Sequence, residues 1–325
     1  MEDRLQNNEN ASGSGKSPGE GFSGGFKKPD LKAAMRLYII VFILLLSLGA
    51  IAQTLHFEIG MIITQVILIL LPAVWFLRRY RVNWVEFSRL KTLQLKFVPT
   101  IIFLALSMWI LNMILAAGLV TGLMELGYEP VIVIEPPQTF REYLILVLIL
   151  SVFAGICEEV LFRGAIMPSM EGRGLIPAII YSSMLFALFH ITFLNLLSAF
   201  ILGIVIAVVV IKTGSLWGGI VYHMANNFIA ATYLYIAGRQ EVATEIDPQA
   251  LLAALPLFLL ALGGSYIGLR LLQKQSKAEP LLENRRNWLP EGWFGVAFAV
   301  AVLLFLIMAI LELAIGFNWI DLNQL

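Results

Sequence analysis

The sequence predicts an all-α protein, a polytopic membrane helix bundle with about nine transmembrane helices. Hydrophobic residues make up 59% of the 325 residues and charged residues only 14%, which leaves too little polar surface for a soluble protein. The chain also contains repeated apolar runs of about 20 residues, the length that an α-helix needs to cross the hydrocarbon of a bilayer. The predicted spans are residues 36–55, 58–77, 97–124, 142–166, 175–193, 194–211, 215–237, 250–272 and 294–316.

The segments outside the spans are short, and the first of them has a distinct composition. Residues 1–33 are rich in Gly, Ser, Asn and charge, which predicts a disordered cytoplasmic tail that cannot bury enough apolar surface to fold alone. The rest divides into N-terminal transmembrane helices at 34–124, a central membrane core at 141–237 and C-terminal transmembrane helices at 250–325. No loop is long enough for a soluble domain, so any chemistry is expected in or at the membrane.

The positive charges predict the orientation of the chain. With the N-terminus in the cytoplasm, 20 of the 22 Lys and Arg residues fall in cytoplasmic segments, and only Arg141 and Arg239 fall outside. This alternation follows the positive-inside rule, so we expect a multi-pass protein of the cell membrane with a cytoplasmic N-terminus. The formal net charge of zero gives no reason to expect a nucleic-acid partner.

Strongly polar side chains are concentrated in three of the predicted spans. A charged side chain within the bilayer costs about 2.5–3.5 kcal/mol on insertion scales, so such residues indicate a functional site by default. The fourth, fifth and seventh spans carry Glu158, Glu159, Arg163, His190, His223, Asn226 and Asn227. The strongly polar residues of the other spans are chiefly Gln65, Asn112 and Glu312.

Helical spacing separates the roles of the two adjacent glutamates. Glu159 and Arg163 are four residues apart with the acid first, which is the favoured order for an ion pair on one helix face. Glu158 is left without an obvious partner on its own helix, and a free carboxylate can serve as a base. His223 and Asn227 are also four residues apart, so they share a stripe and can both donate hydrogen bonds toward a developing oxyanion.

Two glycines are expected to leave room at such a site. Gly155 lies on the face of Glu158 and predicts open space beside it, and Gly219 lies one turn before His223 and predicts a void next to the imidazole. Structural roles also account for the polar residues, because Glu–Arg pairs, histidines and asparagines all join helices within membranes. Their coincidence on three nearby spans favours a functional site.

Three short motifs follow one another between residues 158 and 227. EEVLFR fits EExxxR, FALFH fits FxxxH, and HMANN fits HxxxN. In this order they resemble the CPBP family of intramembrane proteases (CAAX protease and bacteriocin-processing, also called Abi), which includes the type II CAAX prenyl endopeptidases. The resemblance covers about residues 141–237 and would make this segment the catalytic core.

The resemblance implies an intramembrane endopeptidase whose partners are the lipid bilayer and a membrane-associated protein or peptide substrate, prenylated or CAAX-like. The implied site residues are Glu158, His190, His223 and Asn227 as catalytic residues, with Glu159 and Arg163 in support. The first glutamate would activate a water molecule that His190 holds or polarises. His223 and Asn227 would stabilise the oxyanion.

No cofactor is favoured by the sequence, although zinc stays open. Glu158, His190 and His223 could hold zinc with an open fourth position. The sequence contains no HExxH, and asparagine is a poor zinc ligand, so we prefer a metal-free, glutamate-type protease to a metalloprotease.

Two other function classes stay open. A non-catalytic membrane scaffold or bacteriocin-immunity protein would keep the fold, and a proton-coupled transporter would use the same residue types as a relay, although no repeated halves are visible. The protease interpretation requires Glu158, His190 and His223 to converge. His190 reaches a depth in the membrane similar to that of Glu158 and His223 if residues 167–178 include an interfacial turn and the fifth helix begins near Ile180.

Overall fold

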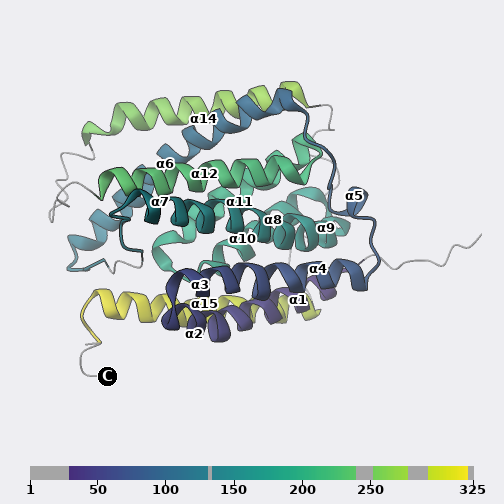
Figure 1. The fold of residues 1–325 in the computed structure, drawn as a ribbon, viewed down its shortest axis with the longest axis horizontal. Helices are drawn as coiled ribbons and strands as arrows, with labels where there is room; N and C mark the ends of the chain where they lie inside the picture. The colour runs from purple at the N-terminus through teal and green to yellow at the C-terminus, as the bar shows by residue number, and fades with distance from the viewer. Residues whose placement is uncertain (1–28, 131–133, 239–251, 277–291, 321–325) are drawn as a thin grey trace, which may run out of the picture.

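The computed structural model describes residues 29–130, 134–238, 252–276 and 292–320, which form helices and short connections without a strand (Figure 1). Among these residues, seven helices are long and apolar enough to cross a membrane. They are Leu31–Leu55, Phe57–Arg79, Leu95–Met124, Phe140–Arg173, Phe193–Thr213, Leu255–Gln275 and Phe294–Gly316. The predicted all-α polytopic bundle is confirmed, and the chain is an integral membrane protein.

Two further helices lie within predicted spans. α12 (Leu216–Ala237) has 22 residues, whereas α10 (Leu175–Phe189) has 15 and is short for a hydrocarbon core about 30 Å thick. The number of nine transmembrane helices and the part boundaries therefore stay predictions. Most of the predicted tail, at 1–28, lies outside the described residues, as does Arg239.

The long helices are built from consecutive helical stretches of different types. The remaining elements are α1 (Leu31–Leu44), η1 (Leu45–Gly49), α2 (Ala50–Leu55), α3 (Phe57–Ile63), η2 (Thr64–Leu70), α4 (Leu71–Arg79), α5 (Trp84–Phe87), η3 (Leu95–Phe97), α6 (Val98–Met124), α7 (Phe140–Leu146), η4 (Val147–Phe153), α8 (Ala154–Glu159), η5 (Val160–Ile166), α9 (Met167–Met170), η6 (Glu171–Arg173), α11 (Phe193–Thr213), α14 (Leu255–Gln275) and α15 (Gly292–Gly316). Four of them, η1, η2, η4 and η5, are π-helical. Such stretches are rare and occur frequently at functional sites.

The helices with the polar motifs lie in the interior of the bundle. In Figure 1, α14 lies along one side and α1, α2 and α15 along the opposite side, with α7, α8, α10, α11 and α12 between them, and α6 crosses obliquely from the α14 side past α12. α11 contacts α10, α12 and α6, and α12 also contacts α8. Polar side chains on the inner faces of these helices can therefore meet each other away from lipid.

Local capping sets several helix ends. Asp30 accepts a hydrogen bond from the backbone N–H of Ala33 at the start of α1. Thr139 and Glu142 form a reciprocal capping box at the start of α7. Gly214 adopts the left-handed conformation, with φ 65°, that ends α11.

The fifth helix differs from the expectation in its start. The expected turn is present, because a 3₁₀ turn at Glu171–Arg173 is followed by Gly174 with φ 111°. α10 begins immediately after this glycine, at Leu175 and not near Ile180, because the turn is complete by Gly174. The helix ends one residue before His190, which therefore lies at its C-terminal end.

The connection between the second and third spans is anchored to the central helices. The Ser88 hydroxyl donates to the carbonyl of Gly164, and the N–H of Leu216 donates to the carbonyl of Arg89. The Arg89 side chain also forms a bidentate ion pair with Glu171, with N–O distances of 2.7 and 2.9 Å. These contacts fix the ends of the helices that carry the first and third motifs.

Candidate active site

The first motif forms the buried ion pair that its spacing predicts. Nη1 of Arg163 donates to Oε1 of Glu159 at 2.9 Å, and both side chains are 0% exposed. Nη2 of Arg163 donates to the carbonyl of Gly203 on α11, and its guanidinium lies over the Phe186 ring at 4.6 Å. Arg163 therefore joins the helix of the first motif to α10 and α11.

The third motif meets the first on the same carboxylate. Nδ1 of His223 lies 2.9 Å from Oε1 of Glu159, the oxygen that also accepts from Arg163. Because a carboxylate only accepts hydrogen bonds, Nδ1 carries the proton in this contact. Nε2 of His223 is then the nitrogen left for a ligand: it accepts when the ring is neutral and donates when the ring is protonated.

His190 is held by the helix that it terminates. Its Nδ1 lies 2.9 Å from the carbonyl oxygen of Phe186, one turn back on α10. A carbonyl also only accepts, so Nδ1 is the protonated nitrogen and Nε2 of the neutral ring is an acceptor. Such an acceptor can bind one hydrogen of a water molecule.

Both histidines contact the same aromatic ring, that of Phe186. The Phe186 ring centroid is 4.8 Å from that of His190 and 5.8 Å from that of His223. Glu158 precedes Glu159, which binds His223 directly. Side chains of the three motifs are therefore linked through Glu159 and Phe186, and the convergence of Glu158 with the two histidines stays a prediction.

The third motif also contains a pair of asparagines that orient each other. Nδ2 of Asn226 donates to Oδ1 of Asn227 at 3.0 Å, and Nδ2 of Asn227 donates to the carbonyl of Leu150 at 2.8 Å. An amide nitrogen has two hydrogens, so one hydrogen of Asn227 is left to donate to a ligand.

Glu158 has a partner that sequence reasoning missed. It has none on its own helix, as expected, but Nε2 of Gln65 donates to its Oε1 at 2.9 Å from η2. Both side chains are buried, at 7% and 4% exposed. The signal that could have found this contact was the isolation of Gln65 as a polar residue in an otherwise apolar span.

The expected open space beside the two glycines is wrong. A Cβ on Gly155 would lie 2.6 Å from Cγ of Met224, and one on Gly219 would lie 2.5 Å from Cγ2 of Val210 and 3.3 Å from Oε2 of Glu159. Side chains of neighbouring helices fill both positions. The glycines instead let α12 approach α8 and α11 closely, which brings His223 to Glu159.

The described residues do not form a metal site. Nowhere in 29–130, 134–238, 252–276 and 292–320 do three His, Cys, Asp or Glu side chains gather closely enough to hold a metal ion. The set Glu158, His190 and His223, which the sequence left open for zinc, is therefore not arranged as a ligand set.

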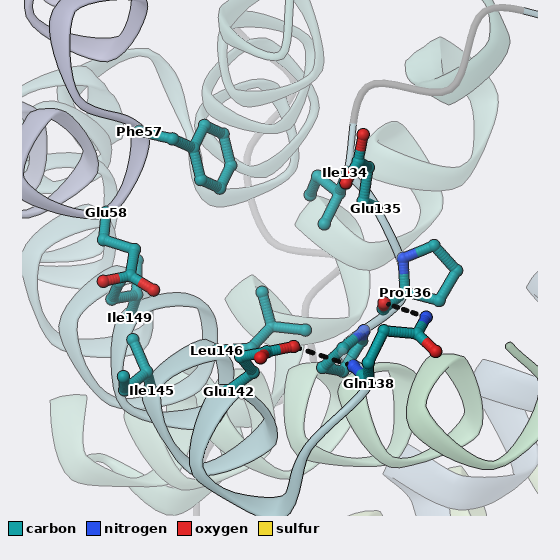
Figure 2. A pocket seen from close by; sticks show the side chains of 11 residues that line it. Phe57, Glu58, Ile134, Glu135, Pro136, Gln138, Glu142, Ile145, Leu146 and Ile149 are labelled. Carbon is teal, nitrogen blue, oxygen red and sulfur yellow. Dashed lines mark hydrogen bonds between the residues drawn. The ribbon is translucent and has the colours of Figure 1, made fainter. Parts of the chain in front are cut away.

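A separate cavity of about 620 Å³ lies between the helices Phe57–Arg79 and Phe140–Arg173. Figure 2 shows Phe57 and Glu58 on one side of it, Leu146 and Ile149 on the helix below, and residues 134–138 on the other side. None of the motif residues lines it. Glu58, which lines the cavity, lies seven residues, or about 10 Å of helix, before Gln65. Because Gln65 is the residue that contacts Glu158, the cavity lies apart from the Glu158 carboxylate.

Residues 140–229 match the family model named Rce1-like, whose description is "Type II CAAX prenyl endopeptidase Rce1-like". The chain carries an Rce1-like domain. The resemblance drawn from the three motifs is confirmed, and the match supports intramembrane endopeptidase activity on membrane-associated protein substrates. The domain runs from the start of α7 into α12 and contains all six motif residues named above. No curated protein and no solved structure matches the chain.

A residue outside the Rce1-like domain supports the position of His190. Glu312 on α15 accepts a hydrogen bond from the N–H of Phe193, the first residue of α11. The N-cap residue of α11, Thr192, makes no capping bond with its own side chain. Ile191 has φ 66°, which is rare for a β-branched residue. Glu312 therefore caps α11 from another helix and holds the strained turn that follows His190.

Replacing Glu312 with leucine is expected to lower the free energy of unfolding by about 1–2 kcal/mol, as the loss of a helix N-cap does. Thermal unfolding of the purified protein in detergent micelles measures the change. Glu312→Gln is the control, because it keeps an acceptor oxygen of the same reach and should lose less. Equal melting temperatures for wild type and Glu312→Leu would contradict the capping role.

Proposed function

We propose that the protein is a metal-free, glutamate-type intramembrane endopeptidase. Its substrate is a membrane-associated protein of the prenylated, CAAX-like class, and it hydrolyses one peptide bond of that protein. The protein resides in the cell membrane with its N-terminus in the cytoplasm, as the distribution of Lys and Arg supports. Residues 141–237 are the catalytic core between two sets of flanking helices.

One observation carries this proposal: the Glu159 carboxylate binds both Arg163 and His223. This contact joins the first and third motifs across 64 residues of chain inside the bundle. A hydrolase uses a buried carboxylate that orients an imidazole to fix the free nitrogen of the ring, and this arrangement supports the catalytic function over a role in joining helices alone.

Water activation is assigned to Glu158 and His190. Glu158 takes a proton from the water through Oε2, which has no hydrogen-bond partner among the described residues. Nε2 of His190 accepts the second hydrogen of the same water and orients it. The water oxygen forms a bond to the carbonyl carbon of the scissile peptide, and the carbonyl π electrons move to its oxygen.

Oxyanion stabilisation is assigned to His223 and Asn227. The free amide hydrogen of Asn227 donates to the oxyanion, and so does Nε2 of His223 when it carries a hydrogen, while the Glu159 carboxylate accepts from Nδ1 of the same ring. When the carbon–nitrogen bond breaks, Glu158 returns its proton to the leaving amine. The immediate products are a carboxylic acid and an amine, and transfer of the acid proton to the amine gives one carboxylate and one ammonium group. Glu158 has returned the proton that it took, so the site finishes in its starting state.

A comparison of protein N-termini tests the proposed function. Membranes from cells that make wild type or Glu158→Gln at equal levels are compared, because glutamine keeps the shape of the base but cannot take the proton. New N-termini that depend on Glu158 are expected, and they would also identify the substrate. Identical termini with both proteins folded would contradict the proposal and favour a scaffold, an immunity protein or a transporter.

A further inference from the structure

The base of the proposed protease receives a hydrogen bond from outside the Rce1-like domain. Gln65 lies in the π-helical stretch η2, and its amide donates to Oε1 of Glu158 across 93 residues of chain. The matched segment, 140–229, contains no part of this helix. Gln65 is a buried polar residue in a predominantly apolar span, and its printed side-chain contact is with Glu158.

The chemistry of the two groups fixes the direction of this bond. A carboxylate can only accept, so the amide must turn its nitrogen toward Glu158 and its oxygen away. Hydrogen bonds to a charged acceptor are stronger than neutral ones, and both residues of this bond are buried. The orientation of the Glu158 carboxylate is therefore held by Gln65.

We infer that Gln65 is a positioning residue that occupies Oε1 of Glu158 and so leaves Oε2 as the oxygen that takes the proton. Oε2 is buried and has no partner within the described part of the chain. A carboxylate with one oxygen held cannot rotate to present the other one. This inference rests on the proposed function, because it assigns the geometry of the same base.

The side chain of Gln65 has a single partner within the described part of the chain, and that partner is Glu158. Oε1 of Gln65 is buried and, among the described residues, has no donor.

Gln65→Met tests the inference, because methionine has a similar length and no donor. The assay uses proteoliposomes and an internally quenched, farnesylated CAAX peptide as the probe. Loss of a hydrogen bond to a charged group is expected to lower kcat about 10- to 100-fold. KM is expected to change less than about twofold, since the lost contact is not with the substrate.

Gln275→Met is the matched control. Gln275 also donates one hydrogen bond from Nε2, to Thr100, and its Oε1 is likewise unpartnered within the described residues. The same substitution there is expected to leave kcat unchanged. Should Gln65→Met fail to fold, Gln65→Asn keeps the amide but withdraws it by one methylene, and the same fall in kcat is expected.

Infrared difference spectra separate this inference from the proposed function. The spectrum of wild type minus Gln65→Met should contain a carboxylate band that is missing when both proteins carry Glu158→Gln. If wild type does not cleave the probe but the band is present, the proposed function fails and the contact stands. If Gln65→Met matches the Gln275→Met control in kcat, or if the band is missing, the inference is overturned.

Discussion

Arg163→Met is expected to lower the free energy of unfolding by about 3–5 kcal/mol, because it leaves the Glu159 carboxylate buried without its cation. Both side chains of the pair are 0% exposed, so water cannot replace the lost partner. The arginine also holds the carbonyl of Gly203 and covers the Phe186 ring. The substitution therefore removes contacts among three helices. Equilibrium unfolding in mixed micelles measures the change in the free energy of unfolding.

Two variants provide the controls for this prediction. Arg89→Met breaks the ion pair with Glu171, whose side chains are 22% and 27% exposed, and should cost at most about 1 kcal/mol. The double variant Glu159→Met/Arg163→Met removes the unpaired charge and should recover much of the lost stability. An Arg163→Met protein as stable as Arg89→Met would show that Glu159 does not depend on this cation.

His223→Phe is expected to reduce kcat by about 10²- to 10³-fold, the usual cost of removing one oxyanion donor. Phenylalanine retains a planar ring beside Phe186 but has no nitrogen for Glu159 or for the substrate. Arg163 still pairs with Glu159 in this variant, so the buried charge stays compensated. KM should change little, because the donor acts on the transition state more than on the bound substrate.

The same substitution at an exposed histidine is the control for the kinetic measurement. His56 lies at the start of α3, where its ring accepts a weak hydrogen bond from the N–H of Ile59 at 3.5 Å. His56→Phe should leave kcat near the wild-type value. A His223→Phe enzyme that also keeps its kcat would remove His223 from the oxyanion site, and a raised KM alone would assign it to substrate binding.

The contacts that could be predicted from the sequence are those between residues about one helical turn apart. The Glu159–Arg163 pair follows from the repeat of 3.6 residues, which places positions four apart on one face. The same rule predicted that Glu158 has no partner on its own helix. Spacing of this kind is local, so it needs no knowledge of how the helices pack.

Contacts between helices could not be predicted in the same way. A helix that is apolar nearly all round does not indicate which face turns inward or how deep each residue lies. The bond from Gln65 to Glu158, the Glu312 cap on α11 and the His223–Glu159 contact all depend on helix rotation and depth.

The sequence by itself determined that this is a helical membrane protein with three polar motifs that follow one another along the chain. The reason is that the length of an apolar run and the helical period are both properties of consecutive residues. Only the tertiary structure decided that Gly155 and Gly219 permit close packing and do not leave voids. It also decided that one carboxylate, Glu159, joins two motifs. The physical reason is that close packing brings together side chains from distant parts of the chain, and their separation along the sequence does not indicate which of them are in contact.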